Sequence, residues 1–174
     1  MHLEWKLWQP KPTHVLKTLQ PSTFHTLADH FSQTLDAEVD VRLLRYREQW
    51  SVFYNSVDSA AFRLYMTLYD PPQPKKLGQG VMVGEPCIVI DDFTLYPEDG
   101  KIRAHLVFAL LTAMETTAFA CIMVQPKSLP QARVYARLGF YRLTEADSMY
   151  GFRFKAKSPQ PQVTSKPLIR IRSK

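Results

Sequence analysis

The region from Pro86 to Val124 constrains the fold more than any other part of this sequence, because it holds two apolar strand-like runs with a helical run between them. Pro86 to Leu95 and Phe119 to Val124 are predicted strands. The helix predicted between them has a core-facing stripe formed by Ile102, Leu106, Ala109, Leu110, Ala113 and Met114. A strand, a helix and a strand of these lengths require a right-handed crossover, which leaves the two strands adjacent and parallel. We therefore expect an α/β fold.

A second predicted helix, Ser128 to Leu138, extends this alternation. It ends at Gly139, where a helix can stop in the left-handed conformation that glycine adopts at little cost. Phe140 to Phe154 is then predicted to form two strands around a turn near Asp147. We expect the strand that follows this helix to continue the parallel arrangement.

The first half of the chain predicts short helices followed by β-rich runs. Trp5 to Leu7 alternates like a strand, and Thr13 to Leu19 is a predicted helix. A second helix starts at Pro21, and its apolar residues at helical spacing are Phe24, Leu27, Phe31 and Leu35. The runs that we expect as strands begin at Val39, Trp50 and Phe62. Pro71 to Lys76 is a predicted loop, and Gly78 to Gly84 allows a turn with a short edge strand.

Positive charge is concentrated in residues 155–174. This segment has six basic residues and no acidic one, whereas the other 16 basic residues are balanced by 16 acidic residues, which gives a net charge of +6. Residues 1–154 are balanced in charge, so we do not expect them to form an extended basic groove. Phosphate binding needs clustered positive charge. We predict a single domain over residues 1–154 and a disordered basic tail that contacts an acidic or nucleic-acid partner.

Other signals limit the compartment and the chemistry. Cys87 and Cys121 lie in apolar contexts, and we expect buried thiols rather than a disulfide. The sequence shows no apolar run of membrane-spanning length and no secretory start, so a cytoplasmic location without membrane contact is expected. His25 and His30 are five apart, which misses the same-face spacing of a helical metal site, and no metal is expected.

Two segments carry a recognisable pattern. The run from Ile90 to Glu98 (IDDFTLYPE) and the run from Tyr135 to Phe140 (YARLGF), in this order, resemble the signature of the GCN5-related N-acetyltransferase family. The resemblance covers about residues 87–142. It implies a mixed, mostly antiparallel sheet with a central pair of parallel strands that splay apart, flanked by helices on both faces. It also implies that acetyl-coenzyme A lies in the gap between the splayed strands.

The resemblance gives catalytic roles to three side chains. Tyr135 matches the tyrosine that protonates the departing coenzyme A thiolate, and the other interpretation is a tyrosine that packs its ring and hydrogen-bonds at the helix surface. Asp91 and Asp92 are neighbours on a strand, so we expect one on each face of the sheet. The outward carboxylate could take the proton from an attacking amine, and the other interpretation is a structural acid at the end of a buried strand.

The resemblance also implies cofactor contacts on the strand and on the loop after it. The expected contact residues are Phe93, Thr94, Leu95, Gly100, Lys101, Arg103, Ala104, His105 and Ser128. Phe93 to Leu95 would form a β-bulge whose backbone amide polarises the acetyl carbonyl. The family's loop is rich in glycine, whereas residues 99–105 contain a single glycine, so side chains there would crowd a pyrophosphate. Lys101, Arg103 and His105 could contact it by charge instead.

Two functions are compatible with these signals. The first is an acyl-coenzyme A-dependent N-acyltransferase that acetylates an amine on a small molecule, a peptide terminus or a lysine. The second is a catalytically inactive protein of the same fold that binds a protein or a nucleic acid, by analogy with divergent viral and mobile-element proteins. The two motifs predict the first function, and the altered cofactor loop and the basic tail motivate the second as the alternative.

Overall fold

The computed structural model describes residues 15–46, 49–57, 61–70, 75–77, 81–143 and 148–154. The predicted strand at Trp5 to Leu7 and the tail at 155–174 lie outside the described residues. The helices are α1 (Val15–Thr18), α2 (Pro21–Leu35), α3 (Gly100–Glu115) and α4 (Leu129–Arg137). The strands are β1 (Val39–Tyr46), β2 (Gln49–Ser56), β3 (Phe62–Tyr69), β4 (Lys75–Leu77), β5 (Val81–Val83), β6 (Cys87–Leu95), β7 (Cys121–Val124), β8 (Tyr141–Arg142) and β9 (Tyr150–Arg153).

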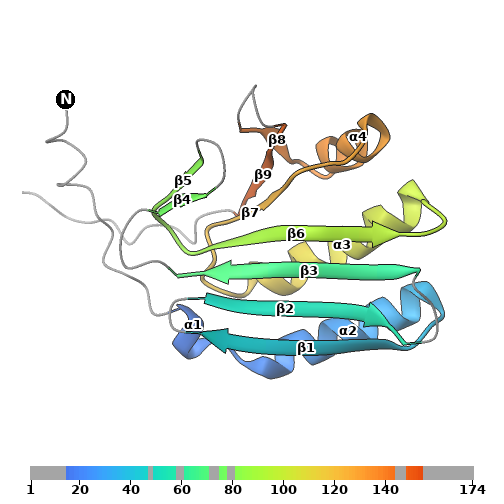
Figure 1. Cartoon of the computed structure of the whole chain (residues 1–174), viewed down its shortest axis with the longest axis horizontal. Coiled ribbons are helices and arrows are strands. Elements are labelled where there is room, and N and C mark those ends of the chain that lie inside the picture. Colours follow the sequence, from blue (N-terminus) through green and yellow to red (C-terminus); the bar gives the residue numbers. More distant parts are fainter. Residues whose placement is uncertain are drawn as a thin grey trace, which may run out of the picture.

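Seven strands form one mixed sheet in the order β1-β2-β3-β6-β7-β9-β8. The β6 and β7 strands are parallel, and the other neighbouring pairs are antiparallel. The predicted fold class is therefore confirmed, with α3 as the crossover between the central parallel strands (Figure 1). The β4 and β5 strands form a separate antiparallel hairpin, so the predicted loop at Pro71 to Lys76 runs into a strand.

The strand after α4, β8, does not become the neighbour of β7. The β9 strand pairs with β7 on one side and with β8 on the other, antiparallel to both. The β8–β9 hairpin therefore brings β9 into the position beside β7 and leaves β8 at the edge of the sheet. The expectation of a further adjacent parallel strand is wrong, because a strand that returns through a hairpin lies antiparallel to its neighbour.

The α2 and α3 helices pack against each other and against one face of the sheet, behind the strands in Figure 1. The α2 helix starts at Pro21, whose fixed φ suits the first turn of a helix. Its buried side chains, Phe24, Leu27, Ala28 and Phe31, follow the predicted helical spacing. They join the β1, β2 and β3 side chains in the main hydrophobic core.

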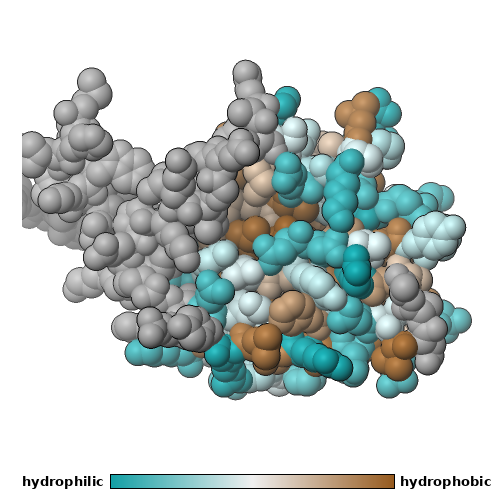
Figure 2. All heavy atoms as spheres, in the orientation of Figure 1, coloured by the Kyte–Doolittle hydropathy of each residue, from teal (hydrophilic) through white to brown (hydrophobic). Residues whose placement is uncertain are grey.

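We use "outer face" for the side of β1, β2, β3 and β6 that faces away from α2 and α3. Leu44 and Arg63 are exposed there, and Phe53 and Tyr65 are half-buried. Figure 2 shows hydrophilic and hydrophobic side chains mixed over the described part of this face. The helices that the resemblance implied on both faces are therefore not found over the outer face of β1 to β3 in the described part of the chain.

The buried stripe of α3 differs from the predicted stripe. The buried residues are Arg103, Leu106, Val107, Leu110, Leu111 and Met114, whereas Ile102, Ala109 and Ala113 are half-buried. This helix has apolar residues on most of its circumference, including Phe108, which is 62% exposed. A pattern that is apolar nearly all round does not fix which side of the helix faces the core. In the structure the helix is rotated so that Arg103 lies on its buried side.

Gly139 occupies the junction between α4 and β8 with a positive φ of 96°. A Cβ at this position would lie 3.3 Å from Cε2 of Phe152. Replacement of Gly139 by alanine is expected to lower the free energy of unfolding by about 1–3 kcal/mol, because a residue with a Cβ is strained in this conformation. Urea unfolding measures the change.

Gly100→Ala is the matched control for this substitution. Gly100 starts α3, and its added Cβ would make an ordinary contact of 3.4 Å with Val134. We expect a change within about 0.5 kcal/mol. Equal losses in the two variants would contradict the role of the positive φ.

Candidate functional site

The β6 and β7 strands separate after four paired positions. Their pairing runs from Cys87 and Cys121 to Ile90 and Val124. The β7 strand ends at Val124, whereas β6 continues to Leu95 (Figure 1). This is the splay in which the resemblance places the cofactor, so its surrounding side chains decide what can bind there.

A buried guanidinium connects the splayed part of β6 to α4. The side chain of Arg103 is fully buried, and its Nε and Nη2 donate to the two carboxylate oxygens of Glu98 at 2.6 and 2.8 Å. Its Nη2 also donates to the backbone carbonyl of Phe93 at 3.2 Å, and the guanidinium lies over the Phe93 ring at 4.2 Å. Its Nη1 donates to the hydroxyl of Tyr135 at 3.4 Å. Arg103 therefore has partners inside the protein and does not present its charge to solvent.

Tyr135 belongs to the same network. Its side chain is 1% exposed, and its ring packs edge-on against Phe140 with ring centroids 5.2 Å apart. Burial raises the pKa of the phenol, and the charge and hydrogen bond of Arg103 act in the opposite direction. The hydroxyl is thus protonated at neutral pH and is committed to Arg103. In this conformation it does not meet a ligand from solvent.

The N-terminus of α3 is capped by a side chain of the protein itself. The carboxylate of Asp99 accepts from the backbone N–H groups of Lys101 at 2.8 Å and Ile102 at 3.1 Å. These amides are the donors that a pyrophosphate at a helix start would need. An N-cap of this kind is worth about 1 kcal/mol, and its negative charge also repels a phosphate.

The remaining predicted residues of this loop are divided between surface and interior. Lys101, His105 and Gly100 are exposed, Ala104 is half-buried, and a Cβ added at Gly100 would contact Val134 of α4. Together with the Asp99 cap and the inward Arg103, this arrangement does not fit a coenzyme A pyrophosphate held by backbone amides.

The β-bulge of β6 lies at Asp91, not at the predicted Phe93 to Leu95. Tyr65 of β3 pairs with Asp92, and the next residue, Met66, pairs with Ile90, so Asp91 has no partner in the register. A bulge places two consecutive side chains opposite one residue of the neighbouring strand. The sequence alone did not indicate this extra residue.

Because of the bulge, both carboxylates lie on the outer face. Asp91 accepts from Thr67 Oγ1 at 2.7 Å, and Asp92 forms an ion pair with Arg63 at 3.1 Å. Thr67 and Arg63 are four apart on β3 and therefore share a face. Asp92 also forms an ion pair with Lys127, which follows β7, at 2.7 Å. The expectation that the two acids face opposite sides is wrong.

The two neighbouring carboxyls have opposite pKa shifts. Burial raises the pKa of Asp91, although the hydrogen bond from Thr67 opposes this. Burial also acts to raise the pKa of Asp92, but the hydrogen bonds from Lys127 and Thr94 and nearby positive charges outweigh it and lower this pKa. Asp91 is thus the better proton acceptor of the pair, and Asp92 stays ionised.

Asparagine substitutions should therefore act in opposite directions. A raised folded-state pKa adds stability that is present below the unfolded value and is lost as pH rises, so Asp91→Asn should leave stability equal or higher at pH 7. A lowered pKa adds stability above the unfolded value, so Asp92→Asn should cost about 0.5–1 kcal/mol at pH 7. The Asp92→Asn penalty should disappear as pH falls below the ordinary value of 3.8. Urea unfolding at several pH values checks this, and penalties of equal size for both variants would contradict it.

Three further predicted residues have structural roles. Thr94 donates its hydroxyl proton to Asp92 at 3.0 Å, and Leu95 is buried in the main core. Ser128 caps α4 by accepting from the backbone N–H of Gln131 at 3.3 Å. None of these side chains contacts Tyr135 or Arg103 through a described hydrogen bond.

Sequence reasoning missed the partner of Arg103. Glu98 was not among the predicted site residues, yet it forms the bidentate pair with Arg103 and also accepts from Gln131 Nε2 at 3.5 Å. A cation on the buried side of a helix requires a nearby anion. The signal was available only if Arg103 was first recognised as inward-facing.

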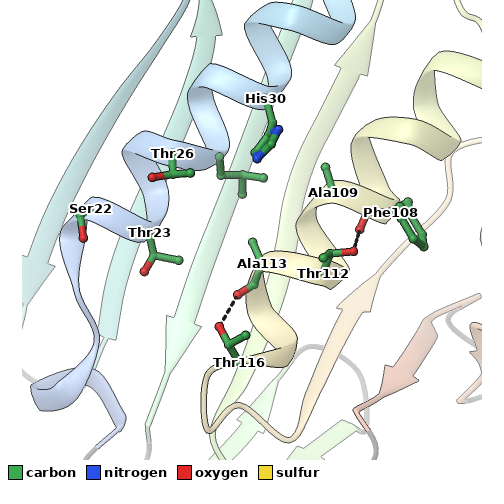
Figure 3. Close-up of a pocket in the computed structure, with 10 residues that line it drawn as sticks. Ser22, Thr23, Thr26, His30, Phe108, Ala109, Thr112, Ala113 and Thr116 are labelled. Carbon is green, nitrogen blue, oxygen red and sulfur yellow. Dashed lines mark hydrogen bonds between the residues drawn. The ribbon is translucent and has the colours of Figure 1, made fainter.

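A separate groove of about 540 Å³ lies between α2 and α3 (Figure 3). Its lining includes hydroxyl side chains, His30 and the exposed Phe108. Thr112 and Thr116 donate to backbone carbonyls of their own helix. No predicted site residue lines this groove.

Two negative findings concern the described residues alone. They contain no cluster of three or more histidine, cysteine, aspartate or glutamate side chains that could hold a metal ion. Within them, no helix has the length and apolar character needed to span a membrane.

The fold and the site define a mixed α/β domain with one splayed parallel pair and, beside it, a buried Arg103 that contacts the buried Tyr135 and the partly exposed Glu98. No protein-family model matches the chain, and no curated protein matches it. Solved structures do match, and one of them is the crystal structure of a KacTA–DNA complex. It is 14% identical, the match covers 78% of this chain and 81% of that chain, and the TM-score is 0.38. A likeness of this size carries no argument about function.

Proposed function

We propose that this chain is a binding module on an acyltransferase-like sheet and that it does not use coenzyme A. The observation that carries the proposal is the buried guanidinium of Arg103, which takes the carbonyl of Phe93 on the splayed strand and the hydroxyl of Tyr135. A pantetheine chain in the splay would have to displace these contacts. A hydrogen bond to a charged group is worth about 1.5–3 kcal/mol, so the loss of these two contacts would remove a large share of a typical ligand's binding energy.

The helix N-terminus supports the same conclusion. A pyrophosphate there would have to replace the Asp99 carboxylate on two backbone amides. The two obstacles are independent, since one lies in the splay and the other at the loop. The Arg103 contacts hinder binding of the pantetheine chain, and the Asp99 cap hinders binding of the pyrophosphate.

The proposed acidic or nucleic-acid partner is inferred from the distribution of charge along the chain. Residues 155–174 carry six basic residues and no acidic one, while the rest of the chain is balanced. A segment of this composition attracts an acidic surface or a nucleic acid and binds less tightly as salt increases. The domain would then position this segment.

Calorimetry with acetyl-coenzyme A tests the first part. We expect no heat of binding to the full chain at millimolar ligand. A chain truncated after Phe154 tests the second part, and we expect it to lose at least about tenfold in retention on a single-stranded DNA or polyglutamate matrix at low salt. Binding of the cofactor, or unchanged retention after truncation on both matrices, would contradict the corresponding part.

A second candidate function is the N-acyltransferase itself, which the pair of acids on the outer face favours. Asp91 has the raised pKa of a proton acceptor and lies on the strand that borders the splay. In this alternative Asp91 would take the proton from an amine, with acetyl-coenzyme A as the acyl donor. It requires Arg103 to leave its network first.

The two functions are separated by one set of measurements. Turnover of acetyl-coenzyme A with a panel of primary amines, reduced at least about tenfold by Asp91→Asn, would support the acyltransferase and reject the binding module. Asp40→Asn, on an exposed edge-strand carboxylate, is the matched control and should leave turnover unchanged. Absence of turnover together with absence of binding would reject the acyltransferase.

A further inference from the structure

The two cysteines of this 174-residue chain are direct neighbours in the sheet. Cys87 opens β6, Cys121 opens β7, and the two residues are partners in the parallel register. Their neighbours Ile88 and Ile122 face the main core, so by alternation both thiols point to the opposite side of the sheet. Cys87 belongs to a small second hydrophobic cluster against which Cys121 packs. A separation of 34 positions in sequence thus becomes a contact between adjacent strands.

The two thiols differ in access and acidity. Cys87 is fully buried, whereas Cys121 is half-buried. A hydrogen bond from the Cys87 thiol lowers the pKa of Cys121, burial opposes this, and the nearby charge of Arg153 assists it. The same hydrogen bond, together with burial, raises the pKa of Cys87. Cys121 is therefore the accessible and more acidic sulfur, and Cys87 is the sheltered one beside it.

We propose that Cys121 and Cys87 form a peroxide-reactive dithiol that closes into a reversible disulfide. In the first step the Cys121 thiolate attacks one oxygen of hydrogen peroxide, the O–O bond breaks, and the released hydroxide takes a proton to form water. In the second step the Cys87 sulfur attacks the sulfenic sulfur of Cys121, the S–O bond breaks, and hydroxide leaves with the Cys87 proton as a second water. Two thiols lose two electrons in total, and one peroxide is reduced.

The sheet geometry permits this disulfide. Neighbouring strands lie about 4.8 Å apart, which is within the Cα–Cα separation of about 4.4–6.8 Å that disulfides span. Because Cys87 and Cys121 are register partners with their thiols on the same side, the bond can close between the two strands. The bond would join β6 to β7 at the end opposite the splay.

Peroxide treatment of the full chain tests the proposal. Free thiols are counted in denaturant before and after treatment, and non-reducing peptide mapping locates any cross-link. We expect both thiols to disappear together, a single intramolecular link between Cys87 and Cys121, and full recovery with dithiothreitol. Loss of one thiol alone, a link between two chains, or two thiols that persist would each overturn it.

Single serine variants test the order of the steps. In Cys87→Ser the Cys121 sulfur should still oxidise but stop at a sulfenic acid that dimedone traps. In Cys121→Ser the remaining thiol should react at least about tenfold more slowly, because it is buried and lacks its acidic partner. Wild-type rates in Cys121→Ser would overturn the assignment of Cys121 as the attacking sulfur. Circular dichroism shows whether each variant is folded, and the wild-type mapping decides the disulfide regardless of the variants.

Discussion

Replacement of Glu98 by alanine is expected to lower the free energy of unfolding by about 3–5 kcal/mol. The substitution removes the carboxylate that neutralises Arg103 and leaves a fully buried guanidinium with two neutral acceptors, the Phe93 carbonyl and the Tyr135 hydroxyl. An unpaired charge in the interior is among the most destabilising single changes. Urea or guanidinium unfolding followed by tryptophan fluorescence measures the loss.

The two partners of this ion pair should not be equivalent. The side chain of Glu98 is 41% exposed to solvent, whereas that of Arg103 is 1% exposed. Arg103→Met leaves a carboxylate that water can reach, so it should be the milder variant. The double variant Glu98→Ala/Arg103→Met should recover much of the stability lost in Glu98→Ala, because no buried charge remains.

Glu85→Ala provides the matched control for this experiment. Glu85 pairs with Arg153 at 3.1 Å, but both side chains reach solvent, so its loss should cost less than about 1 kcal/mol. Equal losses in Glu85→Ala and Glu98→Ala would contradict a buried role for the Arg103 network. A double variant no more stable than Glu98→Ala would contradict the charge-burial explanation.

The order of elements from Pro86 to Leu138 was predictable because local patterns determine it. The apolar run of β6, the helical spacing of α4 and the glycine at its end are all local signals. The position of β9 between β7 and β8 was not predictable in this way, since it depends on long-range pairing. The bulge at Asp91 is also a property of strand pairing, and it moved Asp91 and Asp92 to one face.

The candidate site was predicted in its residues but not in their orientations. Arg103 and Tyr135 were both named from the sequence, yet they contact each other rather than meeting solvent. The rotation of α3 decides this, and its nearly uniform apolar surface hides that rotation. The cap by Asp99 is different, because an aspartate before the start of a helix is a recognisable N-cap signal.

Replacement of Phe31 by alanine is expected to lower the free energy of unfolding by about 3–5 kcal/mol. Phe31 is fully buried on α2, and its ring packs edge-on against Tyr54 and Phe62 with centroid distances of 5.0 and 5.5 Å. Its removal leaves a cavity between α2 and the sheet that close-packed neighbours refill only in part.

Phe108→Ala is the control, because it removes the same type of side chain from an exposed position. Phe108→Ala removes the same side chain from α3, where it is 62% exposed, and should change stability by less than about 1 kcal/mol. Urea unfolding of both variants measures the contrast. A large loss for Phe108→Ala would show that the exposed side of α3 is covered in solution, and a small loss for Phe31→Ala would contradict the packing of α2 on the sheet. Because α2 holds the β1 to β3 half of the sheet, the Phe31 result tests the region of the fold for which the sequence offered no family motif.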